Sequence, residues 1–391
     1  MSTPHTLITG ATGLVGRALT EHFSNLPSHP TTSLSRRPPF HPSTTWHPCD
    51  LTSPPSIIAA LSAIPPSQPP ITHLVFAALH EEPSLAAGWL QQTHVDRNAL
   101  MLQNTVEAVA KVSGALERVT ILQGPKAYGV HVGAVRPGSR EDRDEERGVV
   151  NFYWAQQDWL AEFCELEGRR RGRELCYTVL RPALVIGEAV GGAMNLLAVL
   201  GVYAAILRGR GERLHYPGGG EGMVEATDTD LMARCCEWIG KGRVVGGDRK
   251  EVPMGNQTYN LTNGEFFSMR HEWAFIAQCF GMEVGEDRDI TFAEAIQTQE
   301  WKDEWDSIRK DHGLISPGIE EFLGQSGQFA DFIFGRTAGT SSAMSCIKVR
   351  RAGFDEYMYS DDMLSKWFKR YQDDKLLPQF TTGTGQTKSC I

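Results

Sequence analysis

The sequence predicts an α/β fold, a Rossmann-type doubly wound parallel sheet with a smaller, mainly helical C-terminal substrate lobe. Short strand-like runs alternate with helical patterns over the first 182 residues, and this alternation is typical of a parallel sheet covered by helices on both faces. A glycine-rich segment, Gly10-Ala11-Thr12-Gly13-Leu14-Val15-Gly16, follows the first strand and opens the first helix. After Arg181-Pro182 the pattern changes, because glycine clusters flank an apolar helix.

The elements are expected in the following order. Strands are predicted at Thr6–Thr9, Thr32–Leu34, His73–Ala77, Val119–Gln123 and Cys176–Leu180. Helices are predicted at Leu14–Phe23, Ile57–Ala63, Val95–Val112 and Tyr153–Glu167. The dense charge run Ser139–Arg147 is predicted to be a solvated loop.

Three regions follow from this order. Residues 1–182 form the predicted Rossmann domain, to which segments return from about 210–265, and residues 183–379 form the substrate-binding lobe and helical extension. Within the lobe, the apolar helix Leu196–Leu207 is either a lid that closes over the site or a static core helix. Helices at Glu272–Phe280 and Phe292–Ser307 complete the lobe. The Thr/Gly/Gln-rich tail at 380–391 is expected to be disordered.

Composition and charge exclude several classes of protein. The formal net charge of −9 leaves no basic surplus to neutralise phosphates, so nucleic acid is not an expected partner. The longest apolar stretch is about half of the ~20 residues that a membrane-spanning helix needs, and the first residues show no signal-peptide pattern. The 8 cysteines lack metal-ligand spacing. We therefore expect free thiols, no metal site, no membrane association and a cytoplasmic location.

The glycine segment predicts a dinucleotide site. Gly10 permits the tight turn after the strand, Gly13 lets the backbone approach a pyrophosphate, and Gly16 allows close packing of helix on strand. The helix N-terminus then presents unsatisfied N–H groups to the phosphates. A glycine loop can be purely structural, but its place between a strand and a helix favours nucleotide binding.

The end of the second strand indicates which dinucleotide binds. NAD-binding domains place an acid there for the ribose 2′-hydroxyl, whereas NADP-binding domains use arginine for the 2′-phosphate. Here the residues are Ser35-Arg36-Arg37, with no acid nearby. Surface arginines are common, but this position favours NADPH. Asp50-Leu51 would contact the adenine edge, or would simply precede a helix cap at Thr52.

Two residues are candidates for a catalytic pair. Lys126 follows the fourth predicted strand, and Tyr153 opens the next helix. Taken singly, Lys126 could be a solvated loop lysine and Tyr153 a packed core aromatic. The literal Tyr-x-x-x-Lys motif of short-chain dehydrogenases occurs once, at Tyr371–Lys375. We reject it as a polar helix end, because it lies far along the chain from the predicted sheet edge.

The segments around Lys126 and Tyr153 resemble the lysine and tyrosine motifs of the progesterone 5β-reductase / iridoid synthase family. This family is an atypical branch of the extended short-chain dehydrogenases that pairs a loop lysine with a tyrosine in an Asn-Phe-Tyr-Tyr segment. The resemblance covers about residues 5 to 290. It continues through Asn98–Asn104, Arg181–Gly187, Ala193–Asn195, Tyr216–Gly218, Thr227–Leu231 and Tyr259–Gly264.

The resemblance implies a set of cofactor contacts. Together with Gly10, Val15 and Gly16 of the glycine loop and with Gln123, the candidate cofactor-binding residues are Thr12, Gly13, Leu14, Arg36, Arg37, Asp50, Leu51, Ala78, Leu122, Tyr153, Val185, Gly192, Ala193 and Met194. The sequence departs from the plant members at Gln123, Ala127 and Trp154, which replace threonine, histidine and tyrosine. An insertion at 241–256 is also longer than in those members. These departures leave the pair in place and put the plant substrates in doubt.

The resemblance implies NADPH-dependent reduction of a carbonyl-activated C=C bond in a small enone or enal. Tyr153 would hydrogen-bond the carbonyl oxygen, and Lys126 would support it electrostatically. Reduction of a ketone or aldehyde and redox-neutral epimerisation remain alternatives, as does a non-enzymatic NADP sensor. A sensor would be expected to have lost Lys126 or Tyr153, and both are present. A homodimer is left open.

Overall fold

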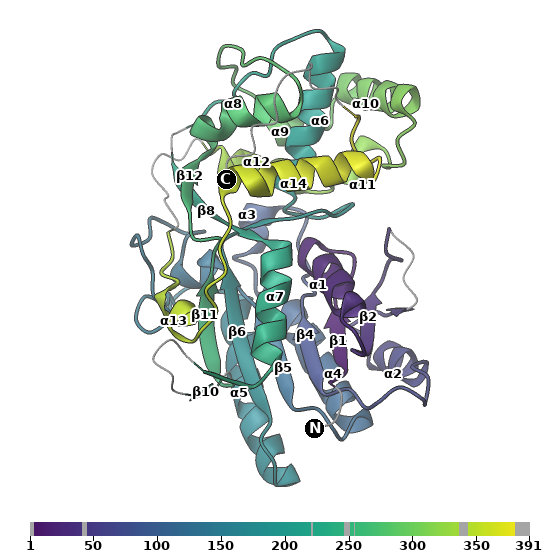
Figure 1. Ribbon diagram of the computed structural model, residues 1–391, viewed down its shortest axis with the longest axis vertical. Helices are drawn as coiled ribbons and strands as arrows, with labels where there is room; N and C mark the ends of the chain where they lie inside the picture. The colour runs from purple at the N-terminus through teal and green to yellow at the C-terminus, as the bar shows by residue number, and fades with distance from the viewer. Residues whose placement is uncertain are drawn as a thin grey trace. The chain divides into compact units, whose positions relative to one another are not determined.

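The structure is a computed structural model that describes residues 4–40, 45–219, 222–245, 251–253, 255–335 and 343–379. The chain divides into two compact units, each assembled from separate stretches of sequence. The first unit contains residues 1–187, 225–265 and 340–358, and the second contains residues 188–224, 266–339 and 359–391. Figure 1 shows the elements along the chain.

A seven-stranded sheet is the centre of the first unit. Its strand order is β11-β6-β5-β4-β1-β2-β3, and every neighbouring pair is parallel. The strands are β1 Thr6–Thr9, β2 Thr31–Ser35, β3 Trp46–Pro48, β4 His73–Phe76, β5 Arg118–Leu122, β6 Cys176–Pro182 and β11 Gln257–Leu261. The order reverses between β1 and β4, and in such sheets ligands bind outside the carboxyl ends of the strands at this switch point.

Both faces of the sheet are buried by helices, and the alternation along β1 shows the division. Leu7 packs with α2 Pro54–Ser62, α4 Gln92–Val112 and α5 Phe152–Arg171. Ile8 packs on the opposite face with α1 Leu14–Asn25, α7 Thr229–Gly240 and α13 Ile347–Arg351. Successive side chains point to opposite faces of a strand, so a doubly covered sheet needs such continuous apolar runs.

Shorter elements complete the first unit. They are α3 Leu85–Gly88, the 3₁₀ helix η1 Pro125–Tyr128, the parallel pair β7 Leu184–Ile186 and β8 Met223–Asp228, and the antiparallel pair β9 Arg243–Val245 and β10 Glu251–Pro253. The first two of these follow β4 and β5, so they lie in the loops at the carboxyl ends of those strands.

The second unit is mainly helical and is built around α6 Leu196–Gly209. Every residue from Leu196 to Leu207 is buried, and a helix that is apolar on all sides forms a core. The other elements are β12 Phe266–Ser268, α8 Met269–Cys279, α9 Phe292–Ala295, α10 Gln299–His312, α11 Ile319–Leu323, α12 Ser326–Ile333 and α14 Ser360–Asp373. No helix in the described part of the chain is long and apolar enough to cross a membrane.

The predicted fold class is confirmed, and several local predictions need correction. The helix predicted at Phe292–Ser307 is two helices, because the Thr298 side chain accepts from the Trp301 N–H and caps the start of α10. The charge run Ser139–Arg147 is not simply solvated, since Ser139 is buried and Glu145 forms an ion pair with the fully buried Arg181. The tail at 380–391 lies outside the described residues, as does part of the 241–256 insertion.

Candidate active site

The glycine loop lies against the end of β4. Gly10 has φ +71°, and a Cβ added to it would lie 2.6 Å from the Ala77 carbonyl oxygen. A Cβ on Gly16 would lie 2.1 Å from the Gly10 carbonyl oxygen. Both positions therefore require glycine. Gly13 is the N-cap of α1, and in the described structure neither a capping side chain nor an acid occupies its first turn. The positive end of α1 is thus available to an anion, which fits a dinucleotide pyrophosphate.

The other loop residues of this predicted site have mixed surroundings. Thr12, Leu14 and Val15 are partly exposed at the start of α1. Arg36 and Arg37 are exposed directly after β2. The Asp50 carboxylate accepts from the Thr52 N–H at 2.9 Å and from the Thr52 hydroxyl at 2.8 Å. These hydrogen bonds, with the charge of Arg36, hold the pKa of Asp50 below its usual value. The Leu51 side chain packs in the core.

The remaining predicted contacts lie in different parts of the fold. Ala78 follows β4, Leu122 ends β5 and Val185 lies in β7. The Gln123 side chain is engaged inside the protein: its carbonyl accepts from Arg181 Nε at 2.8 Å, and its amide donates to the Tyr153 carbonyl oxygen at 3.2 Å. Gly192, Ala193 and Met194 belong to the second unit and are partly exposed there.

Asn151 joins the two candidate catalytic segments. Its side-chain oxygen accepts from the Tyr153 N–H at 3.0 Å and caps α5, while its amide donates to the Lys126 carbonyl oxygen at 3.1 Å. Gly124, at the end of β5, approaches the tyrosine closely, since a Cβ there would lie 3.3 Å from the Tyr153 hydroxyl. The structure therefore brings Lys126, in η1, and Tyr153, in α5, to the same strand end.

Burial sets the protonation states of this pair. It raises the pKa of Tyr153 far above the usual tyrosine value, and the charge of Glu81 acts in the same direction. Burial lowers the pKa of Lys126 to about 8, against the opposing effect of Glu81. Among the described residues, neither the Tyr153 hydroxyl nor the Lys126 ammonium has a hydrogen-bond partner. At neutral pH the same strand end thus carries a neutral tyrosine hydroxyl and a mostly cationic lysine.

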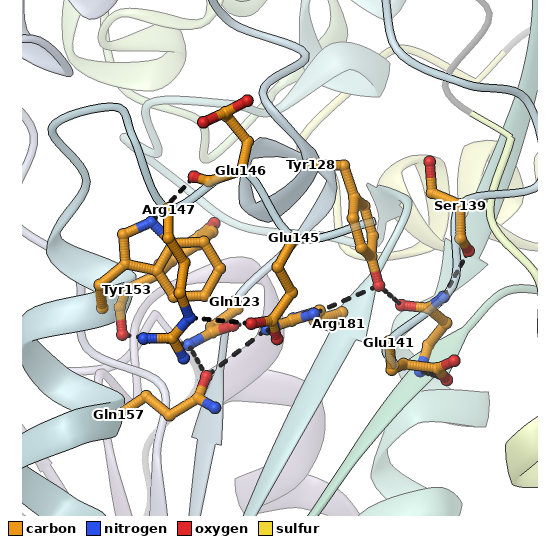
Figure 2. A network of polar contacts seen from close by, with 12 residues as sticks. Gln123, Tyr128, Ser139, Glu141, Glu145, Glu146, Arg147, Tyr153, Gln157 and Arg181 are labelled. Atoms are coloured by element: carbon orange, nitrogen blue, oxygen red, sulfur yellow. Dashed lines mark hydrogen bonds and ion pairs between the residues drawn. The ribbon is translucent and has the colours of Figure 1, made fainter. Parts of the chain in front are cut away.

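A buried polar network contacts the backbone of Tyr153 (Figure 2). The fully buried Arg181 donates to Glu145 at 2.7 Å and to Gln123 at 2.8 Å. Gln123 in turn donates to the Tyr153 backbone oxygen and, at 3.0 Å, to Gln157. The charge run that supplies Glu145 is therefore connected to the backbone of the candidate catalytic helix. Sequence reasoning missed this network, because a mixed charge run has the pattern of a solvated surface.

Trp154, a departure from the plant sequences, also binds this charge run. Its indole N–H donates to the Glu146 carbonyl oxygen at 3.1 Å, and the Arg147 guanidinium lies 4.5 Å from its ring centroid. Figure 2 shows the neighbouring Glu145 side chain reaching the Arg181 guanidinium. Trp154 therefore holds the loop and the helix together.

The literal Tyr371-x-x-x-Lys375 motif is not a catalytic pair in this fold. Tyr371 is fully buried in α14, and its hydroxyl accepts from the Asn195 amide at 2.8 Å. Lys375 lies beyond the end of α14, in the left-handed region with φ +54°. The two residues therefore do not share a helix. The segment does lie at the polar end of α14, as expected, and only Tyr371 within it is a core residue of the second unit.

Comparison with known proteins supports the resemblance. Residues 6–244 match the NAD dependent epimerase/dehydratase family. A (S)-8-oxocitronellyl enol synthase of Nepeta racemosa is 26% identical over 395 residues, which cover 95% of this chain and 92% of the relative. A 3-oxo-Delta(4,5)-steroid 5-beta-reductase of Arabidopsis thaliana is 27% identical over 395 residues, with the same coverage. A short chain dehydrogenase of Penicillium aethiopicum is 26% identical and covers 95% and 98% of the two chains.

Solved structures with the same fold include two UDP-glucose 4-epimerases. The enzyme of Thermotoga maritima, solved with UDP-glucose, has a TM-score of 0.61 at 13% identity and covers 94% of this chain and 99% of that one. The Thermus thermophilus enzyme, in complex with NAD, has a TM-score of 0.58 at 15% identity, with the same coverage. These similarities establish the extended Rossmann fold.

Proposed function

The chain belongs to the NAD dependent epimerase/dehydratase family, within the extended short-chain dehydrogenases, and we propose that it is an NADPH-dependent reductase of carbonyl-activated C=C bonds. Membership makes it an NAD(P)-dependent enzyme of the reductase and epimerase class. The relatives named oxocitronellyl enol synthase and steroid 5-beta-reductase favour reduction of a conjugated carbonyl compound within that class.

One observation carries the proposal: the almost completely buried Tyr153 has a hydroxyl without a hydrogen-bond partner among the described residues, and it shares the end of β5 with Lys126, whose pKa burial lowers to about 8. Such a hydroxyl is free to donate to a substrate carbonyl oxygen. Asn151 and Gly124 hold Lys126 and Tyr153 at the carboxyl end of β5, beside the switch point of the sheet. This edge is where a dinucleotide binds in doubly wound sheets.

The residues of the chain divide the chemistry between them. Bound NADPH supplies a hydride, which in conjugate reduction goes to the β-carbon of the substrate. Tyr153 donates a hydrogen bond to the carbonyl oxygen and stabilises the negative charge that develops there as an enolate. Lys126 supports that donor through its positive charge. The raised pKa of Tyr153 keeps the hydroxyl protonated, so it acts as a donor and not as a base.

The preference for NADPH is assigned to Arg36 and Arg37. Both are exposed after β2, and the Asp50 carboxylate nearby is already hydrogen-bonded to Thr52. A charge-assisted hydrogen bond contributes ~1.5–3 kcal/mol, so Arg36→Ala or Arg37→Ala is expected to weaken NADPH binding by ~10- to 100-fold. Affinity for NADH should barely change. Titration of both cofactors into each variant measures this, and equal losses for the two cofactors contradict the assignment.

The family description favours one alternative, redox-neutral epimerisation. An epimerase returns the hydride to its product, so it shows no net consumption of cofactor, whereas a reductase oxidises NADPH in proportion to product. The first experiment is therefore an NADPH-consumption screen over small enones, enals and ketones with product identification. A saturated carbonyl product supports the proposal, and an allylic or simple alcohol identifies a carbonyl reductase instead.

A further inference from the structure

One tryptophan contacts both members of the candidate catalytic pair. Trp89 directly follows α3, in the loop after β4, and is almost completely buried. The Lys126 ammonium lies 3.5 Å from the centroid of its ring. The Tyr153 ring packs against the same indole in a T-shaped arrangement, with centroids 5.5 Å apart and planes at 81°. An ammonium at this distance over an indole face is held by the ring quadrupole.

The orientation of Trp89 is fixed by a buried carboxylate and by aromatic neighbours. Its indole N–H donates to Glu81 Oε2 at 3.0 Å, and the same oxygen lies 3.4 Å from His94 Nε2. The Phe152 ring packs at 5.0 Å, tilted by 46°. Because Glu81 and His94 are themselves buried, the indole has little freedom to turn away from Lys126.

Glu81 also supplies a negative charge that the site needs. Its second oxygen, Oε1, is buried without a hydrogen-bond partner in the described structure. A buried carboxylate in this state is costly unless a positive charge lies nearby. Lys126 provides that charge, and the attraction opposes the loss of the lysine proton that burial favours.

We propose that Trp89 and Glu81 are positioning residues for catalysis: Trp89 holds the Lys126 ammonium on its ring face beside Tyr153, while Glu81 orients the indole and keeps the lysine charged. The proposal rests on the proposed function for the roles of Lys126 and Tyr153. It accounts for a lysine that has no hydrogen-bond acceptor among the described residues and yet has a defined place. The ammonium is thus fixed without a hydrogen-bond acceptor of its own. Such an acceptor could compete with the substrate carbonyl for the hydrogen bond that the Tyr153 hydroxyl donates.

The groups that face Lys126 determine how the site responds to pH. They are Glu81 from the segment after β4 and His131 from the segment after η1, while Tyr153 from α5 packs on the same indole. Burial lowers the pKa of His131 to about 4, and the charge of Lys126 acts in the same direction, so His131 is neutral near pH 8. Tyr153 stays protonated there. Activity that depends on the ammonium should therefore be lost as pH rises through about 8.

Glu81→Gln tests the electrostatic half of the proposal. Glutamine keeps an oxygen that can accept from the Trp89 N–H but removes the charge, so the Lys126 pKa should fall by about one unit. In the pH profile of kcat/KM for NADPH-dependent reduction of trans-2-hexenal, the midpoint of the fall in activity at high pH (the basic limb) should shift to lower pH by the same amount. Glu82→Gln is the matched control, because Glu82 is the adjacent acid and its carboxylate approaches His80 at 3.3 Å. Its limb should coincide with that of the unchanged protein.

Trp89→Leu and Trp89→Phe test the positioning half. Leucine keeps an apolar filling but has no ring face, so kcat should fall by about 10-fold or more while the affinity for NADPH is retained. Phenylalanine restores a face without the N–H and should recover part of kcat. If leucine prevents folding, the phenylalanine variant and Glu81→Gln decide the matter alone. Equal kcat in both tryptophan variants and the unchanged protein, with an unshifted limb in Glu81→Gln, overturns the proposal.

A readout without substrate separates this inference from the proposed function. The rate at which acetic anhydride labels Lys126, followed by mass spectrometry against pH, reports its protonation directly. A downward shift in Glu81→Gln but not in Glu82→Gln supports the positioning role even if no enal is reduced, in which case the proposed reaction fails by itself. An unshifted labelling profile together with normal enal reduction rejects the role of Glu81 and leaves the reductase intact.

Discussion

Replacing Tyr153 with phenylalanine is expected to slow enal reduction by ~100- to 1000-fold, the range observed when one oxyanion donor is removed. The reason is geometric, since the hydroxyl is the donor that Gly124 and the capped start of α5 place at the strand end. NADPH affinity should survive, because it is assigned to the glycine loop and the arginines. Steady-state kinetics and cofactor titration of the same variant measure both effects.

The choice of substrate makes this experiment more informative. An enolate needs only stabilisation and can be protonated later on carbon by water, whereas a ketone oxygen that receives hydride needs a proton at once. Tyr153→Phe should therefore leave measurable reduction of a strongly activated enal and remove reduction of a simple ketone. Lys126→Ala should reduce the rate similarly, and the two losses should not add, because the pair acts as a unit. Full activity in Tyr153→Phe means that the mechanism is wrong.

A loss of stability is expected from Glu145→Ala. It leaves the guanidinium of Arg181 fully buried without its carboxylate, and removing one partner of a buried pair costs about 3 kcal/mol or more. For a unit of this size each kcal/mol lowers the melting temperature by about 2–4 °C, so a decrease of roughly 6–12 °C is expected. Differential scanning calorimetry measures the shift. Glu145→Gln keeps an acceptor for Arg181, so its melting temperature should lie between those of the unchanged protein and Glu145→Ala.

The matched control for this experiment is Asp142→Ala. This substitution removes the same charge from the same charge run, but the ion pair that it breaks, between Asp142 and Arg140, is exposed. Exposed pairs contribute little to stability, so the melting temperature should hardly change. Equal shifts for Glu145→Ala and Asp142→Ala contradict a structural role for the buried network.

The parts of the fold that could be predicted are those whose signal is local. The segment Gly10–Gly16 predicts β1, α1 and the turn between them, because its glycine spacing is typical of a strand–turn–helix junction. The strand β11 was not predicted, since three of the five residues of Gln257–Leu261 are polar, and the segment becomes a strand by pairing with β6. The three-residue β3 includes Pro48 and lies at the sheet edge, where strand propensity gives little signal.

In the candidate site, too, the residues with a local sequence signal could be predicted and those that depend on tertiary contacts could not. Lys126 and Tyr153 could be placed by motif, because each follows a recognisable strand or opens a helix. Trp89 and Glu81 gave no such signal, since their relation to Lys126 exists only after β4 and β5 lie side by side in the sheet. The ion pair between Glu145 and Arg181 spans 36 residues. No local pattern distinguishes this glutamate from its solvated neighbours.

The discontinuity of the first unit affects the order in which it can form during synthesis. When a ribosome has released the first 187 residues, β1 to β6 are present, but β6 still has an open edge because β11 follows only at Gln257–Leu261. The apolar face of α1, which packs on the sheet, lacks its remaining cover until α7 and then α13, at Ile347–Arg351, have emerged. Open strand edges and uncovered apolar faces invite wrong pairing. Residues 1–187 therefore expose an unpaired strand edge and an incompletely covered helix face until the segments up to Arg351 have been made.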